Sequence, residues 1–466
     1  MKRFLVIAPW VIALVSGCAT GPDYRPPDID SPSAWRTSAG VSNSLADVAW
    51  TDVYRDPVLN TLIAAALTNN HDMRIAIARI DEASAAFRIQ RADLFPSVNA
   101  SASFTTAQVG NIPPLPGAQA DQYDLLGLLS YEVDVWGRIR RLNEAAKAQY
   151  LATEEAYQAV QVGLIAGVAS TYFNLRSIDR QLEIAESTLA SRSNSLELTR
   201  IKFDDGNGIV SELDVAQAMT QVASAQSSIA NLKRLASVGE NALAILLGSN
   251  PRAIPRGLAL EEQWQPDDLP AGLPSDLLLR RPDLRAAEQQ LIAANANIGV
   301  ARAAYFPKIS LTGALGLQSD DLGDLFDTGL SEAWNFQPSI TAPIFNAGKI
   351  RSGVRVAEAR QRAALAAYEQ AIQNAFREVD DALVSIKYIR DQVIADIDVV
   401  KAERRRLELA TLRYEGGVAS YSDVLDAQRF LFSAELTAVQ TRNNLLNATV
   451  QLYKALGGGT FKGTQK

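Results

Sequence analysis

The sequence of 466 residues contains one cysteine, one histidine and three methionines. A single cysteine excludes internal disulfides and paired-cysteine zinc or redox sites, and a single histidine excludes multi-histidine metal cages. Acidic residues outnumber basic ones by 52 to 45, and no basic patch is present, so we expect no nucleic-acid partner. Beyond the N-terminus no run of 18 apolar residues occurs, so no membrane-crossing helix is expected. With so few catalytic residue types, we expect neither an enzyme nor a cofactor.

The N-terminus resembles a bacterial lipoprotein signal. Residues 1–17 contain two basic residues and then the apolar run Phe4–Val15, which is too short to span a bilayer and is typical of a secretory signal. The run is followed by small residues and Cys18, which predicts cleavage before Cys18 and its acylation with a diacylglycerol and an N-acyl chain. Ala19, rather than aspartate, after the cysteine indicates the outer membrane. A buried free thiol is the alternative.

The chain repeats itself at a constant offset of 211 positions. Three groups of residues illustrate this: His71-Asp72-Met73-Arg74 with Pro282-Asp283-Leu284-Arg285, Phe95-Pro96 with Phe306-Pro307, and Trp136-Gly137-Arg138-Ile139-Arg140 with Ala347-Gly348-Lys349-Ile350-Arg351. Matches that recur at one constant offset indicate a tandem duplication, so we expect the two copies to fold alike.

Within each copy the pattern predicts a helical stretch, a β-hairpin and then a long helical hairpin. The helical stretches are expected at about 57–93 and 276–304, where a Phe-Pro pair ends each helix. The β-hairpins are expected at about 97–136 and 308–345, with loops at 109–122 and 318–335, and the helical hairpins at about 138–247 and 349–456.

The predicted strands alternate apolar and polar residues, as in the segment from Val98 to Phe104. Such alternation fits strands with one lipid face and one water face. Four strands are too few to close a membrane barrel, whereas three chains would supply twelve. A soluble α+β protein whose hairpins pack on a core remains the alternative.

The predicted helices are very long. The segment from Arg138 to Phe203 lacks proline, and at 1.5 Å per residue it would form a helix about 100 Å long. Apolar residues at steps of three and four predict a coiled-coil seam: Leu175, Ile178, Leu182, Ala185, Leu189 and Leu196. Glycine-rich turns then reverse the chain in both copies.

Together with the lipoprotein signal and the duplication, three sequence segments carry a family resemblance: Asp56–Ile63, Gly272–Leu284 and Asp423–Ala427. The chain resembles TolC-type outer-membrane efflux proteins in their NodT-like lipoprotein branch. The resemblance implies an α+β membrane protein that assembles as a homotrimer. Its twelve-stranded β-barrel would lie in outer-membrane lipid and continue as a twelve-helix α-barrel through the periplasm.

The resemblance also divides the chain. After the signal, a lipidated segment and belt would cover 18–70, and a belt linker 249–281. The repeats would be 71–248 and 282–457, with a tail at 458–466.

The implied function is the exit duct of a tripartite pump that passes drugs or other small toxic compounds. The implied partners are a periplasmic adaptor protein and an inner-membrane RND-type pump. Three alternatives stay open: a duct for metal efflux, a duct for type I secretion, and a lipid-tethered periplasmic enzyme or scaffold. An enzyme of this composition would have to rely on a carboxylate pair or a Ser-Lys site.

Asp423 and Asp426 are the main candidate site residues. They are three positions apart at the start of a predicted helix and so share a face. In the resembling family such a pair narrows the periplasmic mouth, where a threefold ring of carboxylates would favour cations. The first copy has Glu212 and Val215 at these positions, so only the second has the full pair. The alternative is capping, with Ser422 as N-cap and Asp423 complementing the helix dipole.

Other candidate residues lie nearby. Tyr414 would make closing contacts between hairpins or simply belong to the seam. The tips would contact the adaptor through Gly206, Asn207, Gly208, Gly416, Gly417, Val418 and Ser420. Some relatives lock the gate with an arginine where this chain has Ala419, and Arg413 or Arg200 are the candidate substitutes.

Overall fold

The computed structural model describes residues 19–36, 44–108, 119–205, 210–263, 271–272 and 274–459. Cys18 and the tip residues Gly206, Asn207 and Gly208 lie outside this part of the chain. The chain forms two compact units, each built from segments of both sequence copies. The first comprises Met1–Asp28, Arg79–Glu154 and Ala286–Glu369, and the second Ile29–Ala78, Glu155–Arg285 and Gln370–Lys466.

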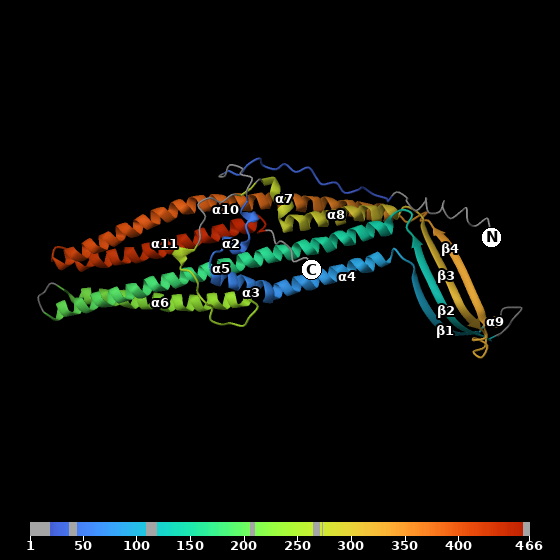
Figure 1. Cartoon of the computed structure of the whole chain (residues 1–466), viewed down its shortest axis with the longest axis horizontal. Coiled ribbons are helices and arrows are strands. Elements are labelled where there is room, and N and C mark those ends of the chain that lie inside the picture. Colours follow the sequence, from blue (N-terminus) through green and yellow to red (C-terminus); the bar gives the residue numbers. More distant parts are fainter. Residues whose placement is uncertain are drawn as a thin grey trace. The chain divides into compact units, whose positions relative to one another are not determined.

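The first unit contains one antiparallel sheet with strand order β1-β2-β3-β4 (Figure 1). Its strands are β1 (Ser97–Gln108), β2 (Gln119–Val133), β3 (Lys308–Ser319) and β4 (Glu332–Thr341), and the short helix α9 (Thr328–Ser331) precedes β4. The loop predicted at 318–335 was too long, because β3 continues to Ser319 and β4 already begins at Glu332. Pro338 is tolerated in β4 because an edge strand does not need every N–H for pairing.

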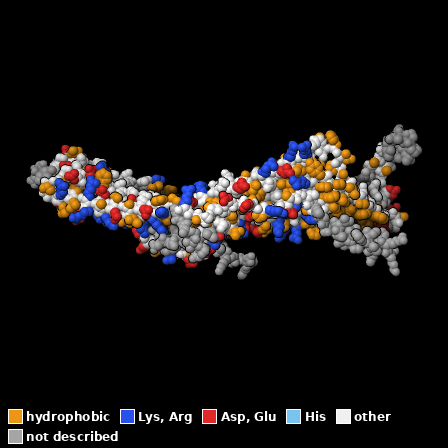
Figure 2. Space-filling model, turned by 90° about the horizontal axis from the view of Figure 1, so that it is seen from above, with side chains coloured by type: hydrophobic (Ala, Val, Ile, Leu, Met, Phe, Trp, Pro, Cys, Tyr) orange, Lys and Arg blue, Asp and Glu red, His pale blue; other side chains and the backbone are white. Residues whose placement is uncertain are grey.

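The strand register places the apolar side chains on one face of the sheet. Phe104 lies opposite Tyr123, Leu315 opposite Trp334, and Ile309 opposite Ile340. These residues are not covered, since Trp334 is 74% exposed and Ile340 70%. Figure 2 shows hydrophobic side chains gathered over the strands. The opposite face is polar, with residues such as Ser103 and Asp124 hydrogen-bonded at 3.1 Å, so the predicted alternation is confirmed.

Residues 19–24 form a strap that joins both copies beside the ends of β2 and β3. The Thr20 amide donates to the Trp136 carbonyl at 2.9 Å, and the Thr20 hydroxyl lies 3.0 Å from the carbonyls of Trp136 and Gly299, with one hydrogen to donate to either. The Trp136 ring stacks on Phe306 at 4.6 Å, and its indole N–H donates to the Pro307 carbonyl at 2.8 Å. The residues that directly follow Cys18 are therefore held at the base of the sheet.

The helical stretch predicted at 57–93 is broken into α3 (Pro57–Asn69) and α4 (His71–Ala92). Asn70 makes the break, because its side-chain oxygen accepts the amides of Asp72 and Met73 at 2.8 and 3.1 Å. Its side-chain amide donates to the Leu246 carbonyl at 2.9 Å, which fixes the break against the end of α6. Such a cap satisfies the free N–H groups of α4.

The helical hairpins have equal dimensions in the two copies. The first arms are α5 (Arg138–Asp204) and α10 (Lys349–Glu415), of 67 residues each, and the second arms are α6 (Glu212–Leu246) and α11 (Tyr421–Ala455), of 35 residues each. The remaining described helices are short or intermediate: η1 (Leu45–Asp47), α2 (Trp50–Val53), η2 (Leu260–Glu262), η3 (Pro274–Asp276), α7 (Leu277–Arg280) and α8 (Pro282–Ala303). Among the described helices, none has the length and apolar character needed to cross a membrane.

The predicted seam packs as expected along α5. Ala185 is fully buried together with Ile229 and Leu232 of α6, and Ile178, Leu182 and Leu189 pack around them. Leu175 belongs to the larger core of the second unit.

A buried carboxylate organises that larger core. Asp56 is fully buried, and its Oδ1 caps α3 by accepting the amides of Val58 and Leu59 at 2.9 and 3.3 Å. Its Oδ2 accepts from the Tyr172 hydroxyl at 2.9 Å, from the Leu258 amide at 3.0 Å and from the Gln263 side-chain amide at 2.9 Å. One side chain therefore joins α3, α5 and the segment after α6 that contains Leu258 and Gln263.

Arg281 joins the linker to both arms of the second copy. Its side chain is 8% exposed and pairs with Asp283 at 2.6 Å and with Glu378 of α10 at 2.8 Å. It also donates to the Ala455 carbonyl, at the end of α11, at 2.9 Å. The segment that contains Arg281 thus connects the two helices of the second helical hairpin at its base.

Candidate functional site

The first turns of α11 have two distinct faces. Tyr421, Val424 and Leu425 are buried against Ala218 of α6. Asp423 lies on the exposed side, and Asp426, one turn further, is half-buried. The apolar residues therefore fix the helix against its neighbours, while the two carboxylates stay on the remaining surface. The structure thus places both predicted gate residues side by side on one helix.

The capping alternative is wrong in its choice of N-cap. Helix α11 begins at Tyr421, and its N-cap is Ser420, whose side chain makes no capping bond. In the first copy the corresponding cap is complete, because Ser211 and Asp214 exchange hydrogen bonds across the start of α6. The carboxylate of Asp423 has no hydrogen bond or ion pair with the described residues, so its charge is available apart from a weak interaction with the helix dipole.

Asp426 has a partner that the sequence analysis missed. Its Oδ1 lies 2.6 Å from Nη2 of Arg429, one turn along α11. The spacing of three residues was the available signal. Arg413 and Arg200, the substitutes suggested from the sequence, make no ion pair with Asp423 or Asp426 among the described residues. The side chains of Asp426 and Arg429 are 50% and 62% exposed, so water screens the pair and it contributes little to stability. The net negative charge of this surface is then that of Asp423.

Tyr414 lies between hairpins of the two copies. Its ring centroid is 5.2 Å from that of Tyr421, and the ammonium of Lys202, on α5, is 4.5 Å from the same ring. Burial raises the pKa of Tyr414, and the nearby Tyr421 and Asp214 add to the shift, so the phenol stays neutral. Tyr414 therefore packs in the apolar cluster of the seam and also contacts Lys202 of the first hairpin, while its role in closing the gate stays a prediction.

The tip of the second hairpin is a tight helix-ending turn. Gly417 has φ of +74°, and the amides of Gly417 and Val418 donate back to Tyr414 and Arg413 at 3.1 and 3.0 Å. This pattern needs glycine at the left-handed position. Val418 is 69% exposed at the tip, and Gly416 and Ser420 are exposed beside it. The corresponding tip of the first copy, with Gly206, Asn207 and Gly208, is outside the described residues.

The family of this chain follows from comparison with known sequences. The family described as outer membrane efflux protein matches residues 62–249 and 273–458. The chain belongs to this family. The two matched segments correspond to the two sequence copies.

Individual relatives cover nearly the whole efflux protein. The solvent efflux pump outer membrane protein SrpC of Pseudomonas putida is 42% identical over 469 residues, covering 98% of each chain. The cation efflux system protein CusC of Escherichia coli O6:H1 is 38% identical over 460 residues, covering 97% of this chain and 98% of CusC. The crystal structure of the open state of the Neisseria gonorrhoeae MtrE outer membrane channel matches with a TM-score of 0.87 and 36% identity, covering 96% and 100%.

These comparisons confirm several predictions made from the sequence. The predicted family and fold class are correct, and the efflux protein is located in the outer membrane. It acts as the outer-membrane component of an efflux pump, and its relatives are transport channels rather than enzymes.

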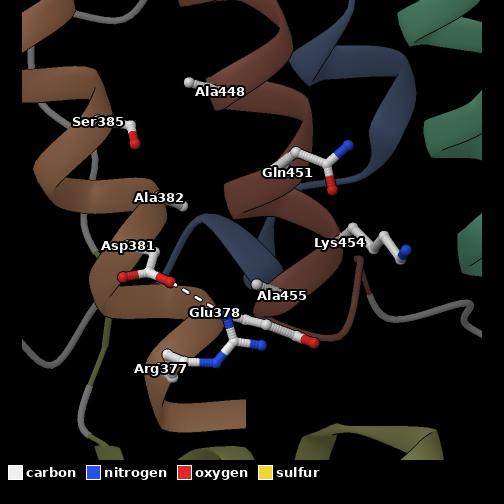
Figure 3. Close-up of a pocket in the computed structure, with 9 residues that line it drawn as sticks. All are labelled: Arg377, Glu378, Asp381, Ala382, Ser385, Ala448, Gln451, Lys454 and Ala455. Carbon is white, nitrogen blue, oxygen red and sulfur yellow. Dashed lines mark hydrogen bonds and ion pairs between the residues drawn. The ribbon is translucent and has the colours of Figure 1, made fainter. Parts of the chain in front are cut away.

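One pocket of the efflux protein bears on the enzyme alternative. A cavity of about 300 Å³ lies between α10 and α11 and is lined by Ser385, Lys454, Asp381 and six other residues (Figure 3). Figure 3 shows Ser385 and Lys454 on different sides of the pocket, with the lysine extended away from the serine. The Arg377–Asp381 ion pair, at 3.3 Å, lies on α10, the same helix as Ser385. This arrangement does not form a Ser-Lys catalytic pair.

Proposed function

We propose that three copies of this chain assemble as a homotrimer whose sheets close into one twelve-stranded barrel. The sheet of one chain ends at β1 and β4, and its apolar face is exposed. Unpaired strand edges are not tolerated in lipid, so the edge strands need partners from other copies. Each chain contains the same unit twice, so three chains would give the trimer an approximate sixfold arrangement of these units.

Asp423 and Asp426 would form the gate at the periplasmic end of this duct. The main support for this gate is that the apolar cluster at Tyr421 and Val424 buries one side of α11 and leaves both carboxylates on the other side. Threefold symmetry would bring three pairs together, and a ring of carboxylates attracts cations and repels anions.

Helix α6 begins at Glu212 and α11 at Tyr421, so the positions of Asp423 and Asp426 are taken in the first copy by Asp214 and Gln217. The equivalence with Glu212 and Val215 expected from the sequence is therefore wrong by two residues. The first copy still has one carboxylate at these positions and not two, and Asp214 takes part in the capping box of α6.

The duct would receive its cargo from an inner-membrane RND-type pump through a periplasmic adaptor that contacts the hairpin tips. The cargo would be small toxic organic compounds, because the relative SrpC is a solvent efflux component. The relative CusC belongs to a cation efflux system, and a carboxylate ring suits cations, so a metal-efflux duct is the second candidate. Acylation of Cys18 would anchor the chain beside the strap.

The gate is tested by single-channel conductance in planar bilayers, comparing the wild-type protein with Asp423→Ala/Asp426→Ala. We expect small, cation-selective currents from the wild type. In the variant the current should rise, on the order of several-fold, and the cation preference should disappear because the carboxylate ring is gone.

Glu212→Ala is the matched control, since it removes an exposed carboxylate from the first turn of α6, the corresponding helix of the first copy. Its selectivity should stay close to that of the wild type. An equal loss of selectivity in Glu212→Ala would contradict the assignment of the gate to the second copy. Absence of current from folded, trimeric wild-type protein would overturn the duct itself.

A further inference from the structure

The two copies differ at the junction between the last strand of each hairpin and the long helix. At the offset of 211, residues 132–140 of the first copy correspond to 343–351 of the second. Because the two junctions descend from one sequence, the first serves as an internal reference for the second.

In the first copy the basic residues at the junction are neutralised. Glu132 pairs with Arg138 at 2.8 Å and with Lys308 at 2.9 Å. Asp134 accepts from the Arg140 amide at 2.9 Å and forms an ion pair with its guanidinium at 3.3 Å. Glu132 and Asp134 thus neutralise the positive charges of this junction through ion pairs within the chain.

The first junction is also covered by the strap. A Cβ added to Gly137 would lie only 2.8 Å from Ala19. At the equivalent Gly348 an added Cβ would meet nothing within 4 Å. Within one chain, therefore, the first junction is closed and the second is open.

In the second copy both acids are missing, but the basic residues remain. Pro343 and Phe345 stand in place of Glu132 and Asp134, while Lys349 and Arg351 keep the positive charges. Lys349, Arg351 and Arg355 have exposed side chains and form no ion pair with the described residues. Arg355 itself replaces Glu144 of the first copy, which adds a further positive charge.

Two fully exposed apolar side chains precede these charges. Ile344 is 97% exposed and Phe345 is 88% exposed. They follow β4 shortly after Ile340, which lies on the apolar face of the sheet and is also exposed. Figure 2 shows basic side chains close to the apolar surface over the strands. Apolar side chains next to unpaired basic ones match the boundary between lipid chains and anionic headgroups.

We propose that the second junction binds the anionic headgroup of a membrane phospholipid, with Lys349 and Arg351 at its phosphate and Ile344 and Phe345 among its acyl chains. The proposal rests on the proposed trimer in the outer membrane. The residue equivalent to Lys308 is Ser97, so a neighbouring copy would supply no carboxylate at this position to pair with Lys349 or Arg351.

The test is native mass spectrometry of the full-length protein in detergent, titrated with phosphatidylglycerol or with phosphatidylcholine of the same acyl chains. Wild type should retain more phosphatidylglycerol than phosphatidylcholine, and Lys349→Gln/Arg351→Gln should lower phosphatidylglycerol binding on the order of ten-fold. The mass of the assembly reports the trimer in the same experiment, so loss of the trimer is distinguished from loss of lipid binding.

Lys401→Gln/Arg405→Gln is the matched control, since it removes the same charge from an exposed part of α10. It should leave phosphatidylglycerol binding unchanged. An equal loss in this control, or no preference for phosphatidylglycerol in the wild type, would overturn the proposal.

A second experiment tests which molecules cover the side chain at position 345. A spin label on Phe345→Cys, in vesicles that contain phosphatidylglycerol, should be accessible to oxygen and shielded from a water-soluble nickel complex. Wild-type protein controls for labelling at Cys18. Shielding from both reagents would indicate that a neighbouring copy covers this position, and would overturn the lipid proposal.

Discussion

Asp56→Ala is expected to lower the free energy of unfolding by about 4 kcal/mol or more, because it strands several buried donors at once. Asp56 accepts five hydrogen bonds from α3, α5 and the segment after α6. Burial raises the pKa of Tyr172, so its phenol stays protonated and would lose its acceptor. The Gln263 side chain would lose one as well. Loss of the α3 cap alone costs about 1 kcal/mol.

The measurement is thermal unfolding of the detergent-solubilised protein, followed by circular dichroism. The melting temperature of Asp56→Asn should lie between those of wild type and Asp56→Ala. The asparagine oxygen still accepts hydrogen bonds, but its NH2 group faces donors at the position of the other carboxylate oxygen. Tyr172→Phe removes one of the five donors to Asp56 and also the acceptor of the Gly257 amide, so it should cost about 2 kcal/mol, less than Asp56→Ala. A melting temperature for Asp56→Ala equal to that of Tyr172→Phe would contradict the central role of Asp56.

Arg281→Ala is expected to cost about 3 kcal/mol, because truncating one member of a buried ion-pair network leaves its other members unpaired. Asp283, Glu378 and the Ala455 carbonyl would each lose their bond to the guanidinium. The same unfolding measurement reports the loss, and the base of the second helical hairpin should become more accessible to proteolysis.

Arg280→Ala is the control for the adjacent residue. Arg280 also has two acidic partners, Asp47 at 2.6 Å and Asp276 at 3.9 Å, but its side chain is 31% exposed. Water replaces such contacts readily, so the cost should stay below about 1 kcal/mol. Equal destabilisation by the two variants would show that burial of Arg281 is not the cause.

The same network gives a pH dependence. Burial opposes ionisation of Asp283, but the hydrogen bonds and charge of Arg281 outweigh it and lower the pKa of the carboxyl. Its contribution to stability is therefore fully present above its ordinary pKa of about 3.9 and is lost as the pH falls through the lowered value. Melting temperatures of wild type should drop on acidification below about pH 4, and Arg281→Ala should show a smaller drop.

The sequence predicted the repeated elements because their signals are periodic and local. The alternation that starts at Val98 and the seam along α5 both depend on side chains a few positions apart, and both are present in the structure. The break at Asn70 was missed because its cap depends on one side chain inside a continuous helical pattern. The start of β4 was missed because the Gly/Asp-rich loop obscured the alternation from Glu332.

The site was predictable only in part. Spacing placed Asp423 and Asp426 on one face of a helix, while Arg429, three positions after Asp426, was overlooked. The roles of Asp56 and Arg281 could not be predicted, because their partners are distant in the chain. Leu258 lies 202 positions from Asp56, and Ala455 lies 174 positions from Arg281. No periodic pattern records such contacts.

The equal arm lengths of the two hairpins limit how the gene can change. Helices α5 and α10 have 67 residues each, and α6 and α11 have 35. One inserted residue would advance a tip by about 1.5 Å and rotate every later side chain by about 100°. An insertion in one arm alone would therefore put the tips of the two copies out of level and turn the carboxylates away. We expect length changes in this lineage to accumulate in the loops, or in whole-turn steps matched between the copies.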